Sequence, residues 1–248
     1  MSEVKVNKIS PRSGTTLTIG DSGDTVTIPS GVTLAPGGDL TLTGALTVDG
    51  ASATIKLDGN YPTGTDNVAL GNTALDDGSL SGGCNVAIGA NSLTANTTGY
   101  GNTASGKDAM RLNTTGYWNS AYGYQALESN TTGYGNTALG RNTLYANTAS
   151  ANTAVGYNAL TANTTGGLNT ALGESALLSN TTASYNVAIG REAAKATTTG
   201  WGNVAIGHQT FIANTTGEKN TAVGINALAA NTTAHENTAV GRNALTAN

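Results

Sequence analysis

The chain has 248 residues and a formal net charge of −4, and only 10% of its residues are charged and 5% aromatic. Such a surface is not basic enough to follow a phosphate backbone, so we expect no nucleic-acid partner. The single cysteine, Cys84, excludes an internal disulfide framework, and no apolar run approaches the ~20 residues of a membrane-spanning helix, which predicts no membrane insertion.

The first 66 residues divide into a leading segment, residues 1–14, and a strand-rich segment, residues 15–66. The leading segment lacks the apolar core of a secretory signal, so we expect synthesis in the cytoplasm without export by the Sec route. The second segment alternates threonine with apolar residues in triplets separated by Gly, Asp and Pro, which is typical of short strands joined by tight turns. It therefore predicts a β-rich collar that ends in a turn-rich junction.

One motif then repeats eleven times over residues 67–248: N-[TVS]-A-x-G, a small residue and a leucine, then N-T-T-G. Its opening asparagines are Asn67, Asn85, Asn102, Asn119, Asn136, Asn152, Asn169, Asn186, Asn203, Asn220 and Asn237. The period is close to 17 residues, too short for a helical repeat and suited to a coil of parallel β structure. We call each repeat a rung.

Within one rung we expect two short strands, the first at residues 153–155 and the second around residues 159–161, with glycine and asparagine at the corners. The residue three after the opening asparagine is mostly Leu, Ile or Val, and the residue eight after it is mostly Leu. Because strand side chains alternate between faces, we expect these two columns to meet inside the coil.

The residue two after the opening asparagine is alanine in all eleven rungs. By the same alternation this alanine column faces away from the leucines, and its small size indicates that another subunit packs closely on it. The predicted subunit interface consists of Ala104, Ala121, Ala138, Ala154, Ala171, Ala188, Ala205 and Ala222.

Two polar or aromatic columns stand out at the corners. The asparagines predict amide ladders, in which each side chain bonds the backbone or its neighbour one rung away. Tyr100, Tyr117 and Tyr134 share one corner position in successive rungs, and Trp118 lies beside them. These four aromatic residues either stack and stiffen the coil or form a glycan-binding strip for a host surface polysaccharide.

The rung N-V-A-I-G, at residues 85–89, 186–190 and 203–207, resembles the head repeat of trimeric autotransporter adhesins, the YadA-like left-handed parallel β-roll. The resemblance covers residues 67–248 and implies a homotrimer. The chain departs from that family in its extra N-T-T-G corner, and it shows no signal peptide, coiled-coil stalk or membrane anchor.

Residues 6–31, V-N-K-I-S-P-R-S-G-T-T-L-T-I-G-D-S-G-D-T-V-T-I-P-S-G, are similar to the N-termini of marine bacteriophage tail-fibre proteins, cyanophages among them. This resemblance implies a virion protein that docks on a tail or baseplate protein through its N-terminus and supports attachment to the host cell surface. It also implies synthesis in the bacterial host.

The sequence offers no candidate catalytic residue, cofactor site or metal site. His208 and His235 do not occupy equivalent positions, and no Cys/His group has metal-ligand spacing. The five acids after residue 108 are scattered through the rungs, so we expect no enzyme, although paired carboxylates of a glycosidase stay open.

The fold that we expect is all-β, a homotrimeric parallel β-roll with 17-residue rungs preceded by the collar. The leading functional hypothesis is a structural and adhesive tail fibre of a bacteriophage virion. The alternatives are an ice-binding or cell-surface adhesin β-solenoid and a fibre-borne depolymerase. Because the last rung is incomplete at Asn248, we also expect either that a separate tip protein covers that end or that the chain is a fragment of a longer product.

Overall fold

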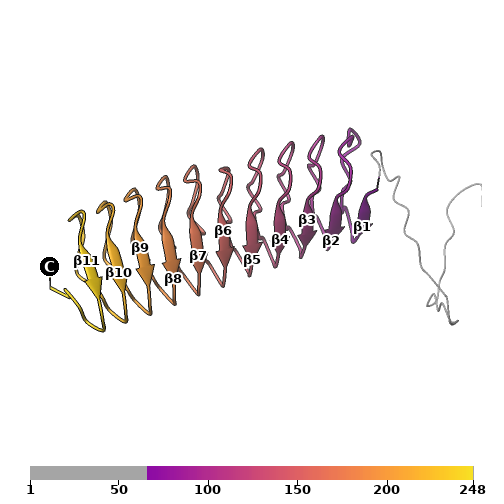
Figure 1. Cartoon of the computed structure of the whole chain (residues 1–248). Helices are drawn as coiled ribbons and strands as arrows, with labels where there is room; N and C mark the ends of the chain where they lie inside the picture. Colours follow the sequence, from indigo (N-terminus) through magenta and orange to yellow (C-terminus); the bar gives the residue numbers. More distant parts are fainter. Residues whose placement is uncertain (1–65, 248) are drawn as a thin grey trace, which may run out of the picture. The chain divides into compact units, whose positions relative to one another are not determined.

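The computed structural model describes residues 66–247, which form a stack of rungs wound as a parallel β-solenoid (Figure 1). Each rung contributes one three-residue strand, and the sheet order follows the chain from β1 to β11. The strands are β1 Val68–Leu70, β2 Val86–Ile88, β3 Thr103–Ser105, β4 Ser120–Tyr122, β5 Thr137–Leu139, β6 Thr153–Val155, β7 Thr170–Leu172, β8 Val187–Ile189, β9 Val204–Ile206, β10 Thr221–Val223 and β11 Thr238–Val240. The predicted repeat and its parallel β structure are confirmed, whereas the leading segment and the collar lie outside the described residues.

Equivalent residues stand directly above one another in the sheet. Ala171 pairs with Ala188 between β7 and β8, and the alanines pair in the same way between all adjacent strands. The rung of 16 residues that begins at Asn136 keeps this register, with Ala138 paired to Ala154. The missing residue is therefore absorbed outside the strands.

The interior of the coil is built from alanine and leucine. Ala171 and Leu177 are both fully buried and belong to one apolar cluster that runs through the stack. In a three-residue strand the central side chain points opposite to its two neighbours. The alanine therefore points inward, and the residues on either side of it point outward.

This arrangement overturns two expectations. The large apolar residue at the end of each strand does not meet the leucines inside; the alanine does. The reason is space, because a coil of about 17 residues holds one large side chain per rung and only a methyl group opposite it. The predicted interface residues are consequently core residues of a single chain: Ala104, Ala121, Ala138, Ala154, Ala171, Ala188, Ala205 and Ala222.

The expected second strand around residues 159–161 is also wrong. The backbone there turns, with left-handed φ values of 57° at Asn158 and 51° at Leu160. The turn still bonds to its neighbours, since Leu160 N donates to Ala176 O at 3.0 Å and Asn158 N donates to Arg141 O at 3.1 Å. The buried leucine side chain holds this residue in a conformation that L-amino acids otherwise avoid.

The glycine that follows each strand allows the rungs to approach closely. A Cβ atom on Gly156 would lie 2.7 Å from the carbonyl carbon of Gly173, and its φ is 126°. Both the positive φ and the contact exclude any larger residue. Among residues 66–247, no helix is long and apolar enough to cross a membrane.

Candidate functional site

The opening asparagines form a buried ladder that ties each rung to the next. Asn119 Oδ1 accepts a hydrogen bond from the Asn136 backbone N–H at 2.9 Å, and Asn119 Nδ2 donates to Gly133 O at 2.8 Å and to Asn102 Oδ1 at 3.2 Å. The same bond from backbone N–H to Oδ1 recurs from Asn67 through Asn237. The predicted amide ladder is confirmed.

A second ladder runs through the asparagines of the N-T-T-G corners. Asn113 Nδ2 donates to Asn96 Oδ1 at 2.7 Å, and Asn130 Nδ2 donates to Asn113 Oδ1 at 2.9 Å. It is interrupted at the buried Oδ1 atoms of Asn130 and Asn180, which have no partner. The rung after Asn130 is one residue short, and the rung after Asn180 carries Thr197 in place of asparagine.

These ladders fix the backbone that carries the aromatic residues. Tyr100, Tyr117 and Tyr134 stack face to face, with ring centroids 5.0 Å apart and planes within 4° of parallel. The Trp118 ring stands nearly perpendicular to them, 5.9 Å from Tyr100 and 5.0 Å from Tyr117. The structure therefore brings together all four aromatic residues singled out in the sequence, and we call this group the aromatic corner.

Trp118 occupies a backbone position that is left-handed in every rung. Its φ is 55°, and it is 63% exposed. Three of the equivalent residues are glycines, Gly101, Gly135 and Gly202, which adopt this φ without a steric penalty, whereas the others, such as Tyr185, bear the same strain as Trp118. A Cβ atom on Gly101 would lie 2.8 Å from Trp118 Cδ1, so the indole ring covers the space that this glycine leaves.

The backbone strain at Trp118 and the stabilisation from its ring contacts are of similar size. A left-handed conformation costs a residue with a Cβ about 1–2 kcal/mol. An edge-to-face aromatic contact contributes about 0.5–1.5 kcal/mol, and Trp118 makes two. The two effects approximately cancel, and most of the indole surface stays in solvent.

An exposed apolar column on the sheet was missed by the sequence reasoning. The residue at the end of each strand points outward, and Leu172, for example, is 45% exposed. Its exposed equivalents are Leu70, Ile88, Tyr122, Leu139, Ile206 and Val240, and its half-buried equivalents are Val155, Ile189 and Val223. We call the outward side of β1 to β11 the sheet face. The sequence signal was present, but it was assigned to the interior.

A column of cations and tyrosines was also missed. It follows the glycine at the end of each strand, a position that varies between rungs. The Arg141 guanidinium lies 5.6 Å from the Tyr124 ring centroid and 5.8 Å from that of Tyr157, and Lys107 Nζ lies 6.0 Å from Tyr124. Such exposed cation–π contacts each contribute about 0.5–1 kcal/mol to the stacking of rungs.

Two acids that the sequence left scattered are held by neighbours. Glu128 accepts from Arg111 Nε and from Gln125 Nε2, each at 2.8 Å, and its negative charge raises the pKa of Tyr145. Hydrogen bonds from Gln209 and Lys195 lower the pKa of Glu192 to about 2. A glycosidase acid needs a raised pKa, so Glu192 does not suit that role.

Comparison with protein-family models, with curated proteins and with solved structures found no match. Within residues 66–247, no group of three or more His, Cys, Asp or Glu side chains could hold a metal ion.

Proposed function

We propose that this chain is a structural and adhesive fibre protein, whose rungs associate with other copies through the sheet face to form a rigid shaft. The observation that supports the proposal is the column of outward-facing Leu, Ile and Val residues, interrupted only by Ser105 and Tyr122, on an uncovered sheet of the described residues. Its biological setting, a bacteriophage tail fibre that supports host attachment, rests on the resemblance of residues 6–31.

The size of the sheet face supports an interaction role. Eleven strands at ~4.8 Å spacing and three residues of ~3.3 Å give a face roughly 50 Å long and 10 Å wide, on the order of 500 Å². The apolar part of this face is the column at the strand ends, because the first residue of the strand is Thr or Ser in seven of the eleven rungs. A standard interface covers about 800 Å² per partner. The sheet face, together with the residues on either side of the strands, approaches the area that one partner contributes to a standard interface.

The periodicity of the sheet face favours a second copy as its partner. A surface whose side chains recur at every rung is matched over its full length only by a surface of the same spacing, and another copy of this chain has that spacing. Ser105 and Tyr122 interrupt the aliphatic column in adjacent rungs, with their Cα atoms paired between β3 and β4. Because Ser105 is small and Tyr122 is large, two copies fit together best at one relative position along the coil axis. The number three follows from the resemblance to trimeric adhesin heads.

The test compares two leucine-to-lysine changes in the same rung. Leu172→Lys places a charge on the sheet face, whereas Leu178→Lys places it on the turn after the buried Leu177, which we call the leucine segment and where the next rung already carries Lys195. We expect the wild-type chain and Leu178→Lys to sediment as trimers of the 24.6 kDa chain, and Leu172→Lys to sediment as a folded monomer.

A monomeric wild-type chain at micromolar concentration contradicts the proposal. So does equal association of the two variants. Thermal hysteresis in the wild-type sample supports the ice-binding alternative instead. The structure offers little for that alternative at the corners, because threonine hydroxyls such as Thr148 Oγ1 already donate to the next rung, here to Thr164 O at 3.0 Å.

A further inference from the structure

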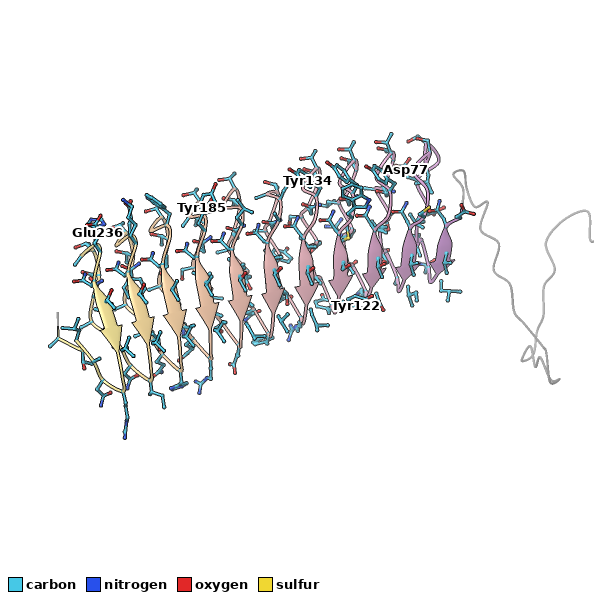
Figure 2. All side chains as sticks on the ribbon, in the orientation of Figure 1. Asp77, Tyr122, Tyr134, Tyr185 and Glu236 are labelled. Carbon is cyan, nitrogen blue, oxygen red and sulfur yellow. The ribbon has the colours of Figure 1, made fainter. Side chains whose placement is uncertain are left out.

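The aromatic corner lies apart from the residue that interrupts the sheet face. Figure 2 shows Tyr134 and Tyr185 at the loop end of the rungs, and Tyr122 at the opposite end of the strands. The column to which Tyr122 belongs and the loops that carry the aromatic corner therefore lie at opposite ends of the strands.

The tyrosine stack alone does not indicate a ligand. Tyr100, Tyr117 and Tyr134 cover one another's faces at 5.0 Å and leave their edges and hydroxyl groups outward, as expected of a stack that stiffens the coil. It does, however, set out three phenolic hydroxyls at a regular spacing along the coil axis.

Trp118 is the residue that stacking does not explain. Its left-handed backbone conformation is shared by the equivalent residue of every rung, so that strain belongs to the repeat, and what distinguishes Trp118 is the position of its ring beside the tyrosine stack. Its indole is 63% exposed and stands perpendicular to the tyrosine planes. The result is a flat apolar platform beside a row of hydroxyls.

The chemistry around this platform is neutral. Residues 96–102, 113–119 and 130–136, which form the three corners, contain only Asn, Thr, Gly, Tyr and Trp. A charged ligand would find no counter-ion among these residues. A sugar ring has an apolar face that stacks on an aromatic ring and hydroxyls that bond to polar tips.

We propose that the aromatic corner binds a neutral, extended oligosaccharide that lies along the coil axis. One pyranose ring stacks on the Trp118 indole, and the phenolic hydroxyls of Tyr100, Tyr117 and Tyr134 bond successive sugars, because the tyrosine ring centroids lie 5.0 Å apart, comparable to one pyranose unit in an extended chain. This inference rests on the proposed adhesive function and names its ligand class.

The test exploits the glycines at the equivalent position. Trp118→Gly introduces the residue that the adjacent rungs carry at Gly101 and Gly135, so it removes strain as well as the platform. Tyr185→Gly is the matched control, because Tyr185 has the same backbone conformation, with φ of 63°, and is 61% exposed, but lies outside the tyrosine stack. The full chain is probed with an array of neutral and acidic bacterial oligosaccharides that includes cellohexaose.

We expect the wild-type chain to bind neutral members of the array. Trp118→Gly should weaken that binding about two- to tenfold, the loss expected for one aromatic stacking contact, and Tyr185→Gly should leave it unchanged. Sedimentation should be the same for all three proteins, and the thermal midpoint of Trp118→Gly should match that of the wild-type chain. In a Trp201→Phe background, which leaves Trp118 as the one tryptophan, the bound sugar should shift the fluorescence emission.

Three results would overturn the inference: no binding to any neutral member, equal losses in the two glycine variants, or a thermal midpoint lowered by Trp118→Gly alone. The last result would assign Trp118 to stiffening of the coil. A trimer that binds no sugar removes this inference and leaves the proposed fibre in place, whereas a monomer that binds sugar removes the fibre and leaves the aromatic corner.

Discussion

The alanine in the centre of each strand sets the thickness of the coil. Ala171 is fully buried against the leucine column, with no room for further methylene groups. We expect Ala171→Leu to lower the free energy of unfolding by about 1–3 kcal/mol, the usual cost of overpacking a core. Chemical denaturation should show this loss in the folded chain whatever its oligomeric state.

The control for this change is the outward neighbour of Ala171. Thr170→Val places in β7 the residue that β8 carries at Val187, and it should alter stability by no more than about 0.5 kcal/mol. Equal stability of Ala171→Leu and Thr170→Val would contradict the interior position of the alanine column.

A second prediction concerns the opening asparagines. Asn119→Ala removes a fully buried amide, leaves the Asn136 backbone N–H without its side-chain acceptor, and takes one of two side-chain donors from the Gly133 carbonyl, which keeps Asn130 Nδ2. Each buried group left unpaired costs about 1–3 kcal/mol. We expect a loss of several kcal/mol by chemical denaturation, against almost none for Asn72→Ala, which is exposed in the first rung. A small loss at both positions would show that the ladder adds nothing to stability.

At the scale of single residues, the sequence was enough for the ladders but not for the direction of the side chains. Asparagine at a fixed position in every rung has few alternatives to a ladder, and the bond from Asn119 to Asn136 follows from the period. An alanine in every rung indicates close packing, but alternation fits either face of the strand equally well. The size of the interior decides, and that size depends on the whole path of the rung.

At the scale of the elements, the strand was predictable and the leucine segment was not. Residues 153–155 follow the strand pattern of a β-branched residue next to glycine corners, and they form β6. Residues 158–160 are Asn, Ala and Leu, and this composition does not predict a turn in which Leu160 has a positive φ. Burial of the leucine outweighs the local preference, and a single rung read by itself does not contain that information.

The aromatic corner was also predictable in part from the sequence. The shared position of Tyr100, Tyr117 and Tyr134 predicts a stack at the rung spacing, and the stack is present. The perpendicular Trp118 depends on its positive φ and on the space above Gly101, which the sequence does not specify. The cation–π column around Arg141 needed only a comparison of the residues that follow each glycine.

At the scale of the whole stack, each rung bonds only to the rungs beside it, as in other repeat proteins. Stability should therefore be a sum over rungs and their contacts. Deleting residues 153–169 removes one period of 17 residues and joins Asn152 to Thr170, so that Ala138 and Ala171 become neighbours in the stack. Both asparagine ladders and the leucine column then rejoin without a change of register.

We expect this full-rung deletion to fold, to self-associate like the wild-type chain, and to be shorter by ~4.8 Å in cryo-electron micrographs. Deleting residues 153–161 instead removes about half a period and sets corner residues against strand residues, which should abolish the cooperative unfolding transition of the rungs after Asn152. Circular dichroism and chemical denaturation of the two deletions measure the difference directly. If the full-rung deletion loses its cooperative unfolding transition as the half-rung deletion does, the rungs are not interchangeable. An interaction beyond neighbouring rungs would then hold the stack together.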